Sequence, residues 1–151
     1  MNPISFIFRT VMRFQTRGKS LDELVAAAAA SGQNISHALA DKADTPENRK
    51  QLRHIIGIER WGQRRLQTLL GEPLLQDEYD GYQPAESLDF QALRAEFAQT
   101  RQTTLDLVRT LQQKGVAETG QALHNGMGEV PVTIWVRYLT MHANFEHTRI
   151  K

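Results

Sequence analysis

Four long amphipathic segments dominate this sequence of 151 residues, and almost no stretch alternates apolar with polar residues. Within each segment apolar residues recur at intervals of three and four, which gathers them on one face of a helix. The expected helices cover about residues 20–39, 45–70, 89–114 and 131–151. Such faces are stable only when they pack against one another, so the sequence predicts an all-α fold, a four-helix bundle.

Local signals mark where several of these helices begin and end. Ser20 and Glu23 have the spacing of a capping box. Pro46 follows the cap residue Thr45, where a proline at the first helical position is favourable. The second helix is expected to stop at Gly71, because glycine readily adopts the left-handed conformation that ends helices.

The remaining segments set the domain organisation. Residues 71–88 are long enough for a crossover between the second and third helices rather than a tight turn. Residues 1–19 form an N-terminal extension with room for a short helix, and 20–151 form the bundle. No stop signal precedes Lys151, so the last helix is expected to reach the end of the sequence.

Composition excludes several classes of function. Lys and Arg number 18 against 17 Asp and Glu, so no nucleic-acid partner is expected. The absence of cysteine removes disulfides, thiolate metal ligands and a cysteine nucleophile. Arg9 and Arg13 interrupt the apolar patch 4–8 before it forms a signal core, and no stretch is long enough to span a membrane. Cytoplasmic is the default location.

Seven ionisable residues fall on or beside the apolar faces of these helices. They are His54, Glu59 and Arg65 in the second helix, Arg101 in the third, and His142, Glu146 and Arg149 in the fourth. Burying such groups without partners costs several kcal/mol each. The pattern therefore predicts that they pair with one another, bind a metal ion or take part in chemistry.

Two arrangements satisfy this requirement. His142 and Glu146 are four residues apart and share a helix face, so with His54 they offer three ligands to a divalent metal. Three protein ligands with an open fourth position are typical of a catalytic metal centre. Alternatively, the arginines neutralise the acids in a buried ion-pair network, and the protein is a non-catalytic bundle that binds a partner or small ligand.

The metal hypothesis assigns roles to the other residues. Glu59 or His147 would act as acid/base or hydrogen-bond partner of the ligands, which makes them the candidate catalytic residues. Arginines would bind an anionic group of the substrate. These candidates are Arg65, Arg101 and Arg149. His147 lies at the margin of the apolar face, so Glu146 is preferred as the third ligand.

The stretch 52–61, followed by Arg65 and Leu66, resembles the second helix of the DinB-like (DinB/YfiT) superfamily. Members show a histidine, an acidic residue five positions later and then an Arg-Leu pair, as His54 and Glu59 do here. The region 79–82 and the last helix also fit, so the resemblance extends over about residues 20–151.

This resemblance implies a four-helix bundle of up-down-down-up topology, a homodimer, and a zinc or nickel ion held by three histidines. His54 matches the ligand of the second helix. The last helix should carry His-x-x-x-His, but here His142 is followed by Glu146; a second register uses His147 and leaves Ala143 at the first position. The resemblance also implies thiol-dependent transferase, isomerase or metal-dependent hydrolase activity on an unidentified small molecule, without selecting among them.

Overall fold

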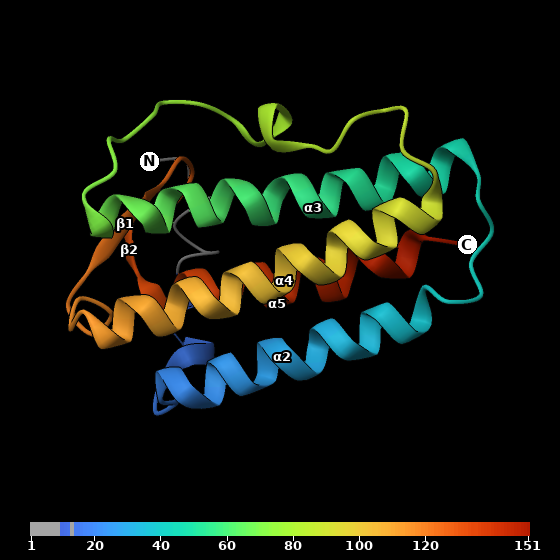
Figure 1. Cartoon of the computed structure of the whole chain (residues 1–151). Coiled ribbons are helices and arrows are strands. Elements are labelled where there is room, and N and C mark those ends of the chain that lie inside the picture. The colour runs from blue at the N-terminus through green and yellow to red at the C-terminus, as the bar shows by residue number, and fades with distance from the viewer. Residues whose placement is uncertain (1–9, 13) are drawn as a thin grey trace.

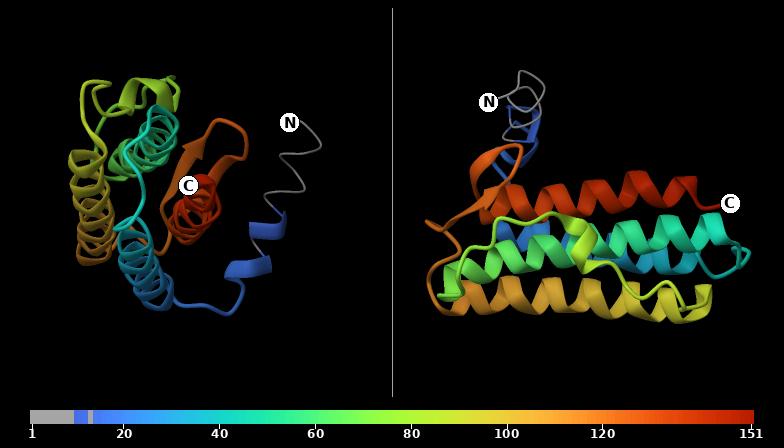
Figure 2. Two further views of the ribbon diagram at one scale, coloured as in Figure 1. Left: turned by 90° about the vertical axis from the view of Figure 1, so that its right-hand side faces the viewer. Right: turned by 90° about the horizontal axis from the view of Figure 1, so that it is seen from above.

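Four long helices form the molecule in the computed structural model, which describes residues 10–12 and 14–151. They are α2 (Leu21–Ala38), α3 (Pro46–Gln67), α4 (Phe90–Gln113) and α5 (Val132–Glu146). Both α2 and α3 pack against α4 and α5 around a common core (Figures 1 and 2). The predicted helical fold is therefore confirmed. Within the predicted extension, residues 10–12 and 14–16 are also helical and a turn follows at 17–18, whereas the apolar patch 4–8, Arg9 and Arg13 lie outside the described residues.

The helix boundaries follow the predicted signals. The Ser20 hydroxyl accepts a hydrogen bond from the Glu23 backbone N–H at 3.2 Å, and Glu23 accepts the Ser20 N–H at 2.7 Å. Thr45 caps α3 through its side-chain oxygen. After α3, the short 3-10 helix η1 (Thr68–Leu70) ends at Gly71, whose φ of 97° is readily accessible to glycine.

The C-terminal end departs from the prediction. Helix α5 stops at Glu146 and the 3-10 helix η3 (His147–Arg149) follows, so the helix does not reach the end of the sequence. Asn48 binds both the N–H and the carbonyl of Lys151, at 3.0 and 2.7 Å. The chain leaves the helix and buries Ile150, whereas Phe145 is 61% exposed.

A small β-hairpin lies between α4 and α5, although the sequence predicted no strands. Strands β1 (Gln121–His124) and β2 (Gly128–Pro131) pair antiparallel, with Ala122 opposite Val130. Four-residue strands are too short for alternation to stand out from a helical background. The hairpin docks on the bundle, where the Trp135 indole N–H donates to the Ala122 carbonyl at 3.1 Å.

The segment 71–88, here called the strap, runs along α3 and contains the 3-10 helix η2 (Tyr79–Tyr82) (Figure 1). Arginines of α3 hold it through its backbone carbonyls: Arg53 donates to Pro84 at 2.8 Å, and Arg64 to Pro73 at 2.6 Å. Gly57 permits close contact, because a Cβ there would lie 2.7 Å from Cγ of Gln83. The strap thus covers a face of α3 that would otherwise meet solvent.

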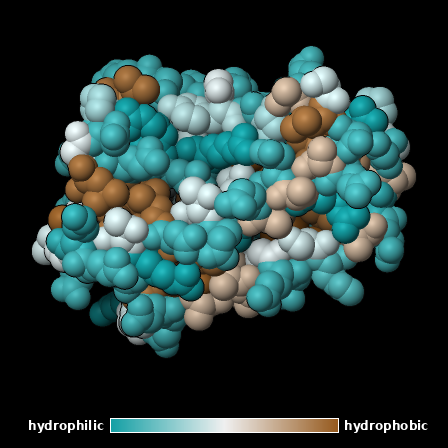
Figure 3. All heavy atoms as spheres, in the orientation of Figure 1, coloured by the Kyte–Doolittle hydropathy of each residue, from teal (hydrophilic) through white to brown (hydrophobic). Residues whose placement is uncertain are grey.

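The surface of the molecule in the view of Figure 3 is mostly hydrophilic, with apolar side chains in separate patches. Within the part of the chain that the structure describes, no helix combines the length and apolarity needed to cross a membrane. The core includes Trp61 and Trp135, and close helix contact at Gly62 would place a Cβ 2.8 Å from Cδ2 of Leu139.

Candidate metal centre

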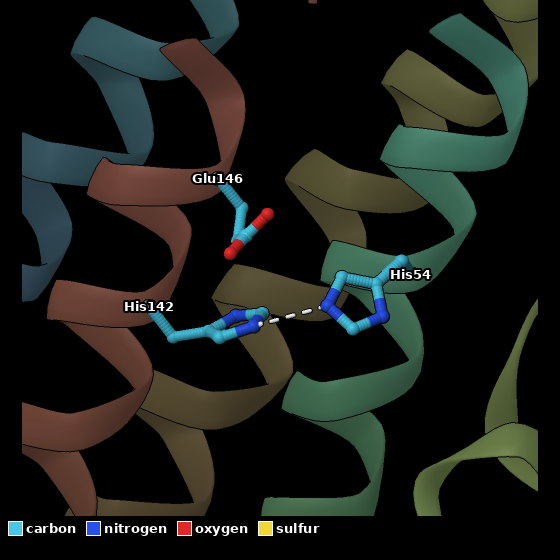
Figure 4. Close-up of side chains that lie close together, drawn as sticks. All are labelled: His54, His142 and Glu146. Atoms are coloured by element: carbon cyan, nitrogen blue, oxygen red, sulfur yellow. Dashed lines mark hydrogen bonds between the residues drawn. The ribbon is translucent and has the colours of Figure 1, made fainter. Parts of the chain in front are cut away.

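Three of the predicted residues lie together between two helices. His54 projects from α3, and His142 and Glu146 project from α5 toward it (Figure 4). The Nε2 atoms of the two histidines are 3.2 Å apart, and one ligand atom from each of the three residues lies within 4.8 Å of the others. Ligands of a tetrahedral zinc ion are about 3.3–3.5 Å apart, given bonds of about 2.0–2.2 Å. The histidine pair, at 3.2 Å, is close to this spacing, and a ligand atom of the carboxylate lies within 4.8 Å of both.

Packing from both sides orients the two imidazole rings. The ring of Tyr79, carried by the strap, meets His54 edge-on at a centroid distance of 5.1 Å and an angle of 84°. The ring of Tyr138 lies 6.1 Å from that of His142, one helical turn away. His142 and Glu146 face the same way because they are four residues apart on α5. The site is therefore formed by α3, α5 and the strap together.

His142 is held in the form that binds metals. Burial, reinforced by the neighbouring His54, lowers its pKa to about 4, so the ring is neutral at physiological pH. Its Nδ1 atom is buried and makes no hydrogen bond to any residue that the structure describes. In metal-binding histidines, the ring N–H on the side away from the metal usually donates a hydrogen bond to an acceptor. Ring contacts, rather than such a bond, orient His142.

The Glu146 carboxylate has one oxygen engaged and one available. Oε2 accepts a hydrogen bond from Gln51 Nε2 at 2.7 Å and forms an ion pair with Arg149 Nη1 at 3.0 Å. Oε1 accepts none from the described residues, although the side chain is only 12% exposed. An available carboxylate oxygen beside two imidazole nitrogens suits a divalent cation. The donor set therefore fits a zinc-type site of two histidines and one glutamate.

A cavity of about 530 Å³ opens beside this group. His54, Tyr79, Glu146 and Arg149 contribute to its wall, together with other polar side chains of α3 and the strap. Cations and anions are mixed there, since Lys50 and Arg149 face the same space as acidic groups. The cavity suits a small polar molecule rather than an extended apolar one.

The structure places Glu59 and Arg101 away from this cavity, in a buried ion pair. Arg101 Nη2 lies 3.0 Å from Glu59 Oε2, and the Thr104 hydroxyl donates to Oε1 at 2.7 Å. A Cβ at position 32 would lie 2.7 Å from Cγ of Arg101, so Gly32 leaves room for the arginine side chain. Neither residue lines the cavity beside the two histidines, and the catalytic role of Glu59 and the substrate-binding role of Arg101 stay predictions.

Arg65 and His147 also have other partners. Arg65 is 1% exposed and holds the strap, donating to the Asp77 carbonyl at 2.9 Å and to Asn125 Oδ1 at 3.0 Å. Nδ1 of His147, the first residue of η3, lies 3.1 Å from the carbonyl of Ala143 in the last turn of α5, and His147 lies outside the three-residue group. Of the three predicted arginines, Arg149 reaches the cavity wall.

One residue beside the site, Gln51, was not predicted, and a partly buried histidine in the hairpin, His124, was predicted only as a loop residue. Gln51 precedes His54 by three residues and so shares its helix face, which is a signal that spacing alone provides. His124 had no such signal. It sits in β1 among Trp61, Trp135 and Tyr138, with ring centroids 4.9–5.2 Å from its own. Only the docking of the hairpin brings it there.

Comparison with known proteins assigns the family. No curated protein and no solved structure matches the chain. A family model described as the DinB superfamily matches residues 40–147, which include α3, the strap, α4, the hairpin and the length of α5. Since this match covers well over half of the sequence, the chain belongs to the DinB superfamily.

Proposed function

We propose that the protein is a metal-dependent enzyme of the hydrolase or thiol-dependent transferase class, in which His54, His142 and Glu146 hold zinc or nickel. The observation that carries this proposal is the convergence of their three ligand atoms within 4.8 Å at the edge of a cavity. Membership of the DinB superfamily supports it.

Different residues of the chain would have different roles at such a site. A bound ion supplies Lewis acidity and lowers the pKa of a coordinated water. Two histidines and one carboxylate leave room for substrate on the side of the cavity. Arg149 and Lys50 attract an anionic group of a small polar substrate, and Tyr79 bounds the space above His54.

Metal binding by purified protein tests this proposal directly. Zinc and nickel affinities are measured by chelator competition for the wild type, for His54→Ala, and for the control His37→Ala on the exposed face of α2. Loss of a ligand should weaken binding by more than the roughly 10–100-fold typical of residues that only support ligands. His37→Ala should bind like the wild type. A wild type that binds neither ion contradicts the proposal.

The same assay tests whether Glu146 or His147 is the third metal ligand. Glu146→Ala should weaken zinc binding strongly, because Glu146 is the residue that joins His54 and His142. His147→Ala should change it little, because the His147 Nδ1 lies against the Ala143 carbonyl of α5. The reverse ranking would make His147 the ligand.

A second candidate function is a non-catalytic bundle stabilised by ion pairs. The Glu59–Arg101 pair and the 3.0 Å Arg149–Glu146 contact favour it, since each carboxylate already faces a cation. It predicts a melting temperature that is independent of chelators. The metal-dependent enzyme instead gains roughly 2.7 kcal/mol at a free metal concentration of 100 times Kd, and chelation removes that gain.

A further inference from the structure

We infer that Gln51 is a positioning residue, which fixes the Glu146 carboxylate so that Oε1 is presented to the metal; this inference rests on the proposed function. Gln51 Nε2 donates to Glu146 Oε2 at 2.7 Å, and it also lies 3.4 Å from the Glu146 backbone carbonyl. Oε1 receives no hydrogen bond within the described part of the chain. One oxygen is thus restrained and the other is left for a ligand.

A carboxylate needs such a restraint more than an imidazole does. Its terminal torsion is broad, so an unrestrained glutamate samples many orientations of its two oxygens. Holding one oxygen fixes the direction of the other, and the ordering cost is met before an ion arrives. Gln51 is suited to this role because an uncharged amide orients the carboxylate without competing with a cation for its charge.

Arg149, the cation that pairs with Glu146, cannot hold the carboxylate in place of Gln51. The Arg149 side chain is 57% exposed, and an exposed ion pair contributes only about 0–1 kcal/mol. Gln51 is partly buried, and α3 carries it one turn before His54. One helix therefore provides a ligand and also orients the ligand that comes from α5.

The test compares Gln51→Leu with Lys50→Met, a control at the neighbouring position that faces the same cavity but does not bond to Glu146. Zinc affinity is measured by chelator competition, and the visible absorption of the cobalt-substituted protein reports the coordination of the ion. We expect Gln51→Leu to weaken zinc binding about 10–100-fold and to alter the cobalt spectrum. Lys50→Met should leave the cobalt spectrum unchanged.

A double-variant cycle separates positioning from packing. If Gln51 acts through the carboxylate, Gln51→Leu should cause no further loss of zinc affinity in the Glu146→Ala background. An equal loss in both backgrounds would mean that Gln51 only packs α3 against α5, and would overturn the inference. So would wild-type affinity and spectrum in Gln51→Leu. A wild type that binds none of zinc, nickel and cobalt overturns the proposed function, and this inference with it.

Discussion

Acidification should destabilise the protein through His124, the histidine of β1 that aromatic rings enclose. Its Nδ1 atom accepts the backbone N–H groups of Gly126 and Met127 at 3.1 and 3.2 Å, which fixes the turn of the hairpin. Burial, and then the positive charge of Arg65, lowers its pKa to about 4. The folded protein therefore holds this ring neutral at a pH where the unfolded chain protonates it.

The sign and size follow from proton linkage. As pH falls below about 6.5, the unfolded chain binds a proton at His124, whereas the folded protein binds it only near pH 4. The stability contributed by the neutral ring is complete above about pH 7 and is lost between there and pH 4. At about 1.4 kcal/mol for each pKa unit, the loss is roughly 3 kcal/mol.

The variant His124→Asn isolates this contribution, because an Asn oxygen can accept the same backbone N–H groups but does not titrate. Urea unfolding of both proteins is followed by circular dichroism between pH 8 and pH 4, in buffer that contains a metal chelator. The variant should be less stable at pH 8, because it loses ring packing. Its deficit should shrink by roughly 3 kcal/mol at pH 4. Parallel stability profiles, or an NMR titration of His124 near its ordinary pKa, would refute the reasoning.

Two further predictions concern the core and the strap. Glu59→Ala should destabilise the fold by about 3–5 kcal/mol, with or without metal, because it leaves Arg101 buried and unpaired. Urea unfolding measures this loss, and a loss below about 1 kcal/mol would contradict a role of the buried pair in stability. Gly57→Ala should push the strap off α3, since its Cβ would lie 2.7 Å from Gln83 and 3.2 Å from the Tyr79 carbonyl. Faster hydrogen exchange over 79–83 would show this, whereas unchanged exchange would mean that the strap accommodates the methyl group.

Helical periodicity was sufficient to predict the candidate site. The spacing of His142 and Glu146 is a local property of one helix, and His54 needed only that α3 and α5 turn their apolar faces toward each other. The same periodicity placed Glu59 and Arg65 on or beside an inward face, and it offered the arginines as partners of the acids without saying which arginine meets which acid. Those partners come from α4 and from the strap, which helix spacing cannot locate. The hairpin was missed for the same reason, since its strands are stabilised by docking rather than by their own pattern.

The seven ionisable residues divide into separate groups, and this division decides what holds Glu146. Arg101 is matched by Glu59, and Arg65 is matched by Asp77 and by carbonyls of the strap, so neither is available to the site. Arg149 is the cation that remains beside Glu146, and its exposure makes the pair weak. A divalent ion at the two Nε2 atoms would interact with Glu146 far more strongly than this arginine does. The ion-pair network and the metal site are therefore compatible features of one bundle, and they compete only at the Glu146 carboxylate.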